Sequence, residues 1–382
     1  MLSFSVVTNI LFFSSVAIIV LKIIFCNDRV VLRLDVRFVL ICLMLVVLRL
    51  LVPVESPLVS RIPIFRIYPD AYRFLRKSLS GFGNIDISWI RILRVGWITG
   101  STVCIIKHCV VYYLVAKQIR TYEGLNNLEL SRVIEKINEE WGKNAKFKLV
   151  GSEYETVPCV FGVFKPYIVL PDKEYSQKEI YYILKHEMSH FYRGDMVARI
   201  LCEVLKAMYW WNPFIYMLSN LVVDMQEVNV DFGIIKGLPN MEQLEYSDCL
   251  IKVARRDICR GRNPYIAGFR RESPSAIHKR IGLMLKSLDM NGGKTVGSIL
   301  LSVFVVCLIT LCPSFFMFEP YSIPDIDIEG SAGIEDGGIY YLRNSDGTFS
   351  VYIDGQYFAT VTKIFDKEIQ IYDNPKEISK GK

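Results

Sequence analysis

The sequence predicts an α+β polytopic membrane protein with four transmembrane helices, a mixed helix-and-strand domain between the third and the fourth, and a small C-terminal β module. Three observations predict this class. Apolar residues make up 52% of the 382 residues, whereas soluble proteins contain roughly 45–50%. Four apolar runs approach the roughly 20 residues that a helix needs to cross a hydrocarbon core. Helical and strand-like patterns fill the segment between the last two runs, and strand-like alternation follows the fourth.

The four predicted transmembrane helices are the apolar runs 4–25, 36–53, 95–117 and 297–318. The first run lacks the basic start and the small-residue cleavage site of a signal peptide, so we expect it to be retained. Lys107 and His108 lie near the middle of the third run. Two interpretations of this pair stay open: a shifted or tilted helix whose lysine extends to the headgroups, or a functional polar pair inside the bundle.

Basic residues beside the spans predict their orientation, because cytoplasmic ends carry an excess of lysine and arginine. They cluster in the short turn after the first span, after the third span and before the fourth, whereas acidic residues follow the fourth. We therefore expect a multi-pass protein of the cell membrane with both termini extracytoplasmic. The 54–94 connection would then be extracytoplasmic as well, although it is basic.

These spans divide the chain into four parts. The predicted boundaries are 1–117 for the first three transmembrane helices with their loops, 118–296 for a cytoplasmic domain, 297–318 for the fourth helix, and 319–382 for an extracytoplasmic linker and β module. Within the last part, residues 339–373 alternate apolar and polar side chains around Asp-Gly turns, which is typical of an antiparallel meander. The formal net charge of +6 is spread along the chain, so we expect no direct binding of nucleic acid.

The cytoplasmic domain begins with a helical pattern at 128–141 and continues with short strand patterns at 146–151 and 166–172. The segment 157–166 between them is expected to form a strand and a turn. A second helix is predicted over SQKEIYYILKHEMSHFYR. Ser176 followed by Glu179 forms the pattern of a capping box at its start. Gly194 suits its end.

This helix carries the pattern His-Glu-x-x-His at 186–190, with two of the 4 histidines of the chain. Positions four apart lie on one face of a helix, so His186 and His190 can present ring nitrogens to one ion. Neutral imidazoles bind Zn²⁺, which makes a bound water more acidic, and Glu187 lies beside them as the general base. The pattern therefore predicts a zinc site for peptide hydrolysis, with Zn²⁺ as cofactor and a protein or peptide as substrate.

Two histidines do not complete a catalytic zinc site, which commonly has three protein ligands. Downstream, an apolar helix over 213–237 carries Glu227 and Asp231 four residues apart. We expect Glu227 to complete the metal site and Asp231 to hydrogen-bond a ligand histidine and fix its tautomer. The alternative is a solvent-exposed acidic edge, which the neighbouring Asp224 keeps open.

The chain resembles the integral-membrane zinc metallopeptidases of the BlaR/MecR type, the sensor-transducers of β-lactam resistance. The matching segments are GVFKPYIVLP, KHEMSHFYRGD, WWNPFIY, EVNVD and HKRIGLMLK, together with the apolar spans. Val230 stands where the family's acidic motif commonly has cysteine, but Glu227 and Asp231 stay in register. The resemblance implies a gluzincin-like domain with His186, His190 and Glu227 as metal ligands and Glu187 as base.

Arg193 and Asp195 match an Arg-x-Asp that recurs after the zinc motif in the family, and we expect them to be structural near the site, anchoring the turn between two helices. The resemblance ends at the C-terminus. Family members carry a large penicillin-binding domain after the fourth span, whereas the small β module is expected here.

The resemblance implies a membrane-embedded zinc endopeptidase that performs regulated proteolysis at the cytoplasmic face. Its substrate would be a repressor, an associated regulator or the chain itself, and a winged-helix transcriptional repressor is a candidate partner. Two alternatives stay open. One is a quality-control protease of the membrane, and the other is a catalytically idle receptor that uses the domain to bind a partner.

Overall fold

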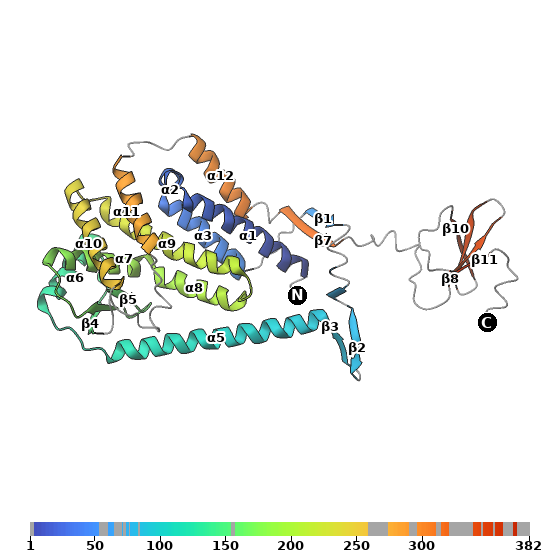
Figure 1. Cartoon of the computed structure of the whole chain (residues 1–382), viewed down its shortest axis with the longest axis horizontal. Coiled ribbons are helices and arrows are strands. Elements are labelled where there is room, and N and C mark those ends of the chain that lie inside the picture. Colours follow the sequence, from blue (N-terminus) through green and yellow to red (C-terminus); the bar gives the residue numbers. More distant parts are fainter. Residues whose placement is uncertain are drawn as a thin grey trace. The chain divides into compact units, whose positions relative to one another are not determined.

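The structure is a computed structural model, which consists of two compact units, Met1–Pro320 and Tyr321–Lys382. The residues that it describes are 4–52, 60–64, 71, 74–75, 77–82, 85–153, 157–258, 274–289, 296–310, 315–320, 339–344, 347–353, 356–361 and 370–372. Each unit is described separately below (Figure 1).

The first unit begins with three consecutive helices, α1 (Phe4–Cys26), α2 (Asp28–Leu34) and α3 (Val36–Leu51). The side chain of Asn27 caps α2, and that of Asp35 caps α3. Asp35 has a φ of 74°, a backbone conformation that non-glycine residues seldom adopt. It turns the chain sharply, so α3 can pack back against α1.

Helix α5 (Trp89–Thr121) is a continuous helix of 33 residues that contains the third predicted span. A hairpin of β2 (Ser78–Phe82) and β3 (Ile85–Ser88) precedes it. Among the described residues, Val6–Cys26 and Trp89–Thr121 are the helical segments long and apolar enough to cross a membrane.

The other two predicted spans form shorter helices. Helix α3 has 16 residues, and α12 (Val296–Thr310) has 15. They coincide with most of the second predicted span and with the first part of the fourth.

The prediction of one helix over 297–318 is wrong at its C-terminal end, because a strand, β7 (Phe316–Pro320), occupies its last residues. Pro313 interrupts the sequence before this strand, and proline disfavours continuation of a helix. Strand β7 pairs in parallel with β1 (Ser60–Ile64). The first residues of the predicted linker 319–338 therefore belong to β7, and 321–338 lie outside the described residues.

The part of the first unit that follows α5 combines a small sheet with helices. Helix α6 (Leu128–Trp141) has the bounds that its pattern predicts. The sheet has the order β4-β6-β5, with β4 (Lys148–Ser152) parallel and β5 (Cys159–Phe161) antiparallel to β6 (Tyr167–Pro171). These strands confirm the three predicted strand segments, and β5 lies at the edge of the sheet.

Among the described residues, the helices between the sheet and α12 are α7 (Gln177–Arg193), α8 (Asp195–Met208), α9 (Pro213–Ile235), α10 (Asn240–Ile258) and α11 (Pro274–Asp289). The predicted capping box of Ser176 and Glu179 is confirmed at the start of α7. Gly194 ends α7 with a φ of 72° and joins it directly to α8. Asn212 caps α9, which packs against α3, α7, α8 and α11.

The second unit contains a four-stranded sheet of the order β10-β9-β8-β11. The strands are β8 (Ile339–Arg343), β9 (Phe349–Ile353), β10 (Gln356–Val361) and β11 (Gln370–Tyr372). Strands β8, β9 and β10 are antiparallel neighbours, which confirms the predicted meander for these three. The prediction of an antiparallel meander is wrong for β11, which lies parallel to β8. A parallel neighbour needs a crossover connection, whereas a meander is built from hairpins.

Candidate metal centre

Helix α7 brings His186 and His190 to one buried face. The two rings are four residues apart, and their Nε2 atoms lie 3.2 Å from each other. Each residue exposes 6% or less of its surface. The spacing in the sequence therefore produces two adjacent imidazoles in a site closed to bulk water.

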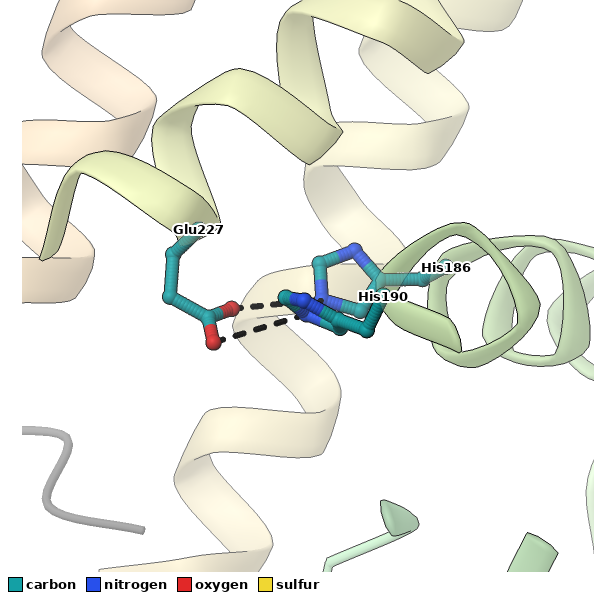
Figure 2. Close-up of side chains that lie close together, drawn as sticks. All are labelled: His186, His190 and Glu227. Carbon is teal, nitrogen blue, oxygen red and sulfur yellow. Dashed lines mark hydrogen bonds and ion pairs between the residues drawn. The ribbon is translucent and has the colours of Figure 1, made fainter. Parts of the chain in front are cut away.

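Glu227 of α9 lies opposite the two histidines (Figure 2). Its Oε2 is 3.3 Å from Nε2 of His186, and its Oε1 is 3.4 Å from Nε2 of His190. Donor atoms of the three residues all lie within 4.8 Å of one another. The structure thus brings together the three side chains that the sequence predicts as metal ligands.

The alternative of a solvent-exposed acidic edge on α9 is wrong. Glu227 exposes 4% of its surface and Asp231 exposes none. Both carboxylates face the protein interior, because the apolar residues of α9 pack against α3, α7 and α8 and leave no solvent-facing side at these positions.

The second ring nitrogen of each histidine has a partner. Nδ1 of His190 lies 2.6 Å from Oδ2 of Asp195. Nδ1 of His186 lies 2.9 Å from Oη of Tyr246, which donates a 2.7 Å hydrogen bond to Oδ1 of Asp231. These contacts favour the tautomers with a proton on Nδ1, so the lone pair of each Nε2 is directed at the cluster.

Two sequence-based roles change as a result. Asp231 lies 3.5 Å from Nδ1 of His186, so its shorter connection to the ring passes through Tyr246 rather than through a direct hydrogen bond. Asp195, expected only to anchor the turn after α7, also orients His190. Arg193 packs against α9 at Gly233, where an added Cβ would overlap its guanidinium group, and this contact agrees with a structural role.

Two arginines contact the carboxylates of α9. Arg280 of α11 bonds both oxygens of Asp231, at 2.7 and 2.9 Å, and lies 3.3 Å from Glu227. Arg199 of α8 lies 2.9 Å from Oε1 of Glu227. Neither arginine, nor Tyr246, was predicted as a site residue. The sequence signal for Arg280 is its position in HKRIGLMLK, where it interrupts an apolar helix face. In the structure this arginine is 5% exposed.

The electrostatics of the cluster favour a cation. Burial by itself lowers the pKa of His186, but hydrogen bonding to Asp231 and Glu227 outweighs it and raises this pKa to about 9. Burial lowers the pKa of His190, but the carboxylates of Glu227 and Asp195 outweigh this effect and raise it above the ordinary value. The same carboxylates that stabilise a protonated ring stabilise a metal ion. Two imidazole nitrogens and one carboxylate oxygen are a donor set of catalytic zinc sites, so the residues present fit Zn²⁺.

Glu187 lies next to the cluster but makes a different contact. Its Oε2 accepts a 2.9 Å hydrogen bond from the backbone N–H of Val160 in edge strand β5. A cavity of about 50 Å³ adjoins Glu187, His190 and Glu227, and helix α5 closes it with Val115 and Ile119. The buried carboxylate therefore faces the space between the histidines, the edge strand and α5.

Comparison with known proteins identifies similar chains over the same region. Residues 83–284, more than half of the chain, match the family model described as BlaR1 peptidase M56. The regulatory protein BlaR1 of Bacillus licheniformis is 30% identical over 158 residues, which are 41% of this chain and 26% of that protein. The methicillin resistance mecR1 protein of Staphylococcus aureus is 27% identical over 184 residues, or 46% of this chain and 30% of that protein. The chain thus spans less than a third of the length of these curated relatives.

Proposed function

The chain belongs to the BlaR1 peptidase M56 family, and we propose that it is a membrane-bound zinc endopeptidase that cleaves a regulatory protein at the cytoplasmic face. The buried cluster of His186, His190 and Glu227 next to the carboxylate of Glu187 carries this proposal. The names of the relatives, a regulatory protein and a resistance protein, support a role in regulation rather than in general degradation.

His186, His190 and Glu227 would hold the ion through two Nε2 atoms and a carboxylate oxygen. When bound, Zn²⁺ supplies Lewis-acid activation of water and of the scissile carbonyl. The protein contributes a fixed ligand geometry, because Asp195 and Tyr246 hold the far sides of the two rings. Arg199 and Arg280 orient the carboxylate of Glu227 from two sides.

Glu187 would act as the general base. Its carboxylate accepts a proton from the attacking water and passes it to the nitrogen of the departing amine, so that the peptide bond is broken and one water is consumed. The residue is 4% exposed, and its contact with Val160 holds the carboxylate at the edge strand.

Strand β5 offers a place for an extended substrate. It is the edge of the sheet β4-β6-β5 and lines the same cavity as Glu187. A peptide that pairs with an edge strand gains backbone hydrogen bonds without regard to side chains. Pairing with β5 would place the peptide backbone next to the metal ligands.

We further propose that four helices, α1, α3, α5 and α12, cross the bilayer, with both termini extracytoplasmic and the metal centre at the cytoplasmic side. The parallel pairing of β1 with β7 supports one part of this topology. It joins the connection after α3 to the segment after α12, so these two segments lie on the same side of the membrane. The basic residues near the turn between α1 and α3 support a cytoplasmic position for that turn.

The substrate and the four-part division of the chain belong to the proposal as well. A winged-helix repressor, an associated regulator and the chain itself are the candidate substrates. A quality-control protease would use the same residues on misfolded membrane proteins. A catalytically idle receptor is less consistent with a buried Glu187 that lines the same cavity as His190 and Glu227, since binding a partner does not require this carboxylate.

The Glu187→Gln variant tests the proposal. The full chain and the variant are each expressed with the candidate repressor, and fragments of the repressor and of the chain are detected by immunoblot. Zinc is measured by elemental analysis of the purified chains. Exposed Glu135 on α6 provides the matched control, Glu135→Gln.

We expect fragments and about one zinc per chain for the parent and for Glu135→Gln. Glu187→Gln should keep its zinc and give no fragments, because Glu187 is not a ligand. Fragments from Glu187→Gln would contradict the proposed base. A zinc-loaded parent that gives no fragments would favour the idle receptor.

A further inference from the structure

Helices α8 and α9 form a hairpin that packs against the N-terminal helices. Side chains of α1, α3, α8 and α9 share one buried apolar core, to which the hairpin contributes Leu205, Leu218 and Val222. Helix α1 is a candidate membrane span. The hairpin that carries the metal ligand Glu227 therefore lies directly against helices that we propose cross the bilayer.

The turn of this hairpin lies at the level where α3 ends and α5 begins. Tyr209 donates a 3.1 Å hydrogen bond from Oη to the carbonyl of Leu50, the next-to-last residue of α3. Trp97, near the start of α5, donates from Nε1 to the carbonyl of Met208. An added Cβ at Gly100 of α5 would overlap the indole of Trp210. In the proposed topology, both of these helix ends are extracytoplasmic.

The opposite end of α9 lies at the opposite end of α3. A groove between the two helices there is lined by Arg37 of α3 with its cap Asp35 and by Phe232 and Gly233 of α9. Helix α9 thus runs antiparallel to α3 along its length. Its 23 residues correspond to about 34 Å at about 1.5 Å per residue, which is close to the thickness of a hydrocarbon core.

The charged side chains in the part of the hairpin that would lie within the bilayer form an ion pair. Between Arg199 and Asp224, the charged side chains are Glu203 and Lys206, which form an ion pair with each other. Glu203 also lies 3.2 Å from Nδ1 of His108 on α5. Charged groups inside a membrane are tolerated when they are paired within the protein. His108, whose role the sequence leaves open, has a 34% exposed side chain and pairs with Glu203 of α8.

The residues around the turn of the hairpin place aromatic side chains on the protein surface. Trp210, Trp211 and Tyr216 are 39, 52 and 44% exposed. Tryptophan and tyrosine are enriched where a protein surface meets lipid headgroups. This surface continues along the exposed apolar side of α5, which is a candidate span, so lipid is the occupant that fits both.

We propose that α8 and α9 form a re-entrant hairpin that inserts into the bilayer from the side of the metal cluster and brings Trp210 and Trp211 to the headgroups of the opposite leaflet. This inference rests on the proposed membrane topology and changes the predicted boundaries, which place the hairpin in the cytoplasmic domain. Among the described residues, neither helix is long and apolar enough to qualify as a span by itself. Neighbouring helices would shelter their polar positions inside the membrane. One helix then connects the outer leaflet to Glu227, about 21 Å along α9 from Pro213.

Cysteine labelling on intact cells tests this placement. Trp211→Cys is placed in the turn, Val52→Cys after the end of α3, and Lys136→Cys on α6 of the proposed cytoplasmic domain. A membrane-impermeant maleimide is applied before and after lysis, and labelling of the parent chain is subtracted. We expect Trp211→Cys to react on intact cells to the level of Val52→Cys, whereas Lys136→Cys reacts only after lysis.

Each outcome bears on one proposal. If Trp211→Cys reacts only under the conditions that label Lys136→Cys, or only in detergent, the turn does not reach the opposite leaflet and the hairpin proposal is wrong. If Val52→Cys and Lys136→Cys exchange sides, the membrane orientation in the proposed function is wrong, and the hairpin is still judged by whether Trp211→Cys follows Val52→Cys. Tyr216→Cys, one turn into α9, replaces Trp211→Cys if that variant does not accumulate.

Discussion

The two histidines of the cluster are oriented by different groups, a carboxylate for His190 and a tyrosine hydroxyl for His186. The hydroxyl of Tyr246 is buried, and burial together with the charge of Asp231 raises its pKa well above the ordinary value. It therefore stays protonated and can accept from His186 while it donates to Asp231. This relay would have been hard to predict, since a tyrosine in a helix 60 residues from His186 gives no local signal.

The first prediction concerns this hydroxyl. Tyr246→Phe keeps the ring but removes the contact with Nδ1 of His186, so we expect zinc affinity to fall by about 10- to 100-fold. Competition with a zinc chelator measures the affinity. Tyr182→Phe is the control, because the ring of Tyr182 packs beside that of Tyr246, with centroids 5.6 Å apart, whereas it is Tyr246 that contacts His186. Equal affinities for both variants would mean that Tyr246 does not orient the ligand.

The second prediction separates the acidic residues of α9. Glu227→Ala should strip zinc from the purified chain, because the carboxylate faces both Nε2 atoms. Asp224→Ala should keep it, since Asp224 does not belong to the cluster. Elemental analysis of the two variants is sufficient. The reverse result would show that the wrong face of α9 was assigned to the metal.

The third prediction is a pH dependence of metal uptake. In the metal-free arrangement the pKa of His186 is raised from 6.5 to about 9. The stabilisation from its protonated form is complete below about 6.5 and is lost as the pH rises through about 9. Zinc needs the neutral ring, so apparent zinc affinity should rise by about tenfold per pH unit between these values for one displaced proton.

Chelator competition at several pH values measures the rise in zinc affinity. The unfolding temperature of the zinc-free chain should instead fall as the pH rises through this range. A zinc affinity that does not change over this pH range would mean that His186 is already neutral before the metal binds.

At the scale of elements, local patterns predicted most of the helices that build the site. The capping box of Ser176 and Glu179 and the glycine at 194 define α7, and Asn212 with Pro213 defines the start of α9. Non-local features were missed for physical reasons. Apolar residues continue beyond Pro313 to Phe318, and nothing local in this run encodes a partner strand, so the pairing of β7 with β1 could not be predicted. The parallel position of β11 depends on a crossover that no local signal encodes.

Helix α5 connects the membrane to the metal centre more directly than the sequence suggested. Val115 and Ile119 are both 1% exposed and close the cavity next to Glu187. Tyr112 packs against Phe161 of the edge strand β5, with ring centroids 5.2 Å apart. A cavity of about 50 Å³ holds a few water molecules but no peptide. Access of a peptide to this cavity would therefore require α5 and β5 to separate.

The fourth prediction follows from this closure. Ile119→Ala removes part of the apolar contact that holds α5 over the site, so the open arrangement gains population and cleavage should become faster. The rate is measured with the substrate identified in the Glu187→Gln experiment. Val103→Ala is the control, because Val103 is 60% exposed on α5, and this variant should leave the rate unchanged. A slower reaction in Ile119→Ala would mean that α5 positions the substrate instead of excluding it.

At the scale of the molecule, the strand β7 joins the exit of α12 to the helix α1. Asn9 of α1 makes two hydrogen bonds with the backbone of Phe318, at 3.0 and 2.9 Å. Helix α1 in turn packs against α9, which carries Glu227. These contacts form a continuous path from β7 through α1 to α9. Packed helices can adopt two discrete arrangements, so a change at β7 can alter the metal centre through α1 and α9.

The last prediction tests whether the second unit, 321–382, supplies such a signal. Deleting it leaves β7 and all residues of the metal centre in place, so zinc content should stay at about one per chain. If the β module senses an external condition, cleavage in the truncated chain should no longer respond to that condition, and the immunoblot should show the same fragments with and without it. A chain with Asn9→Ala keeps the module but loses the link from β7 to α1, and it should weaken the response in the same direction. Normal regulation in the truncated chain would instead assign sensing to the 54–94 connection or to the membrane helices, whose contacts with α9 do not depend on the module.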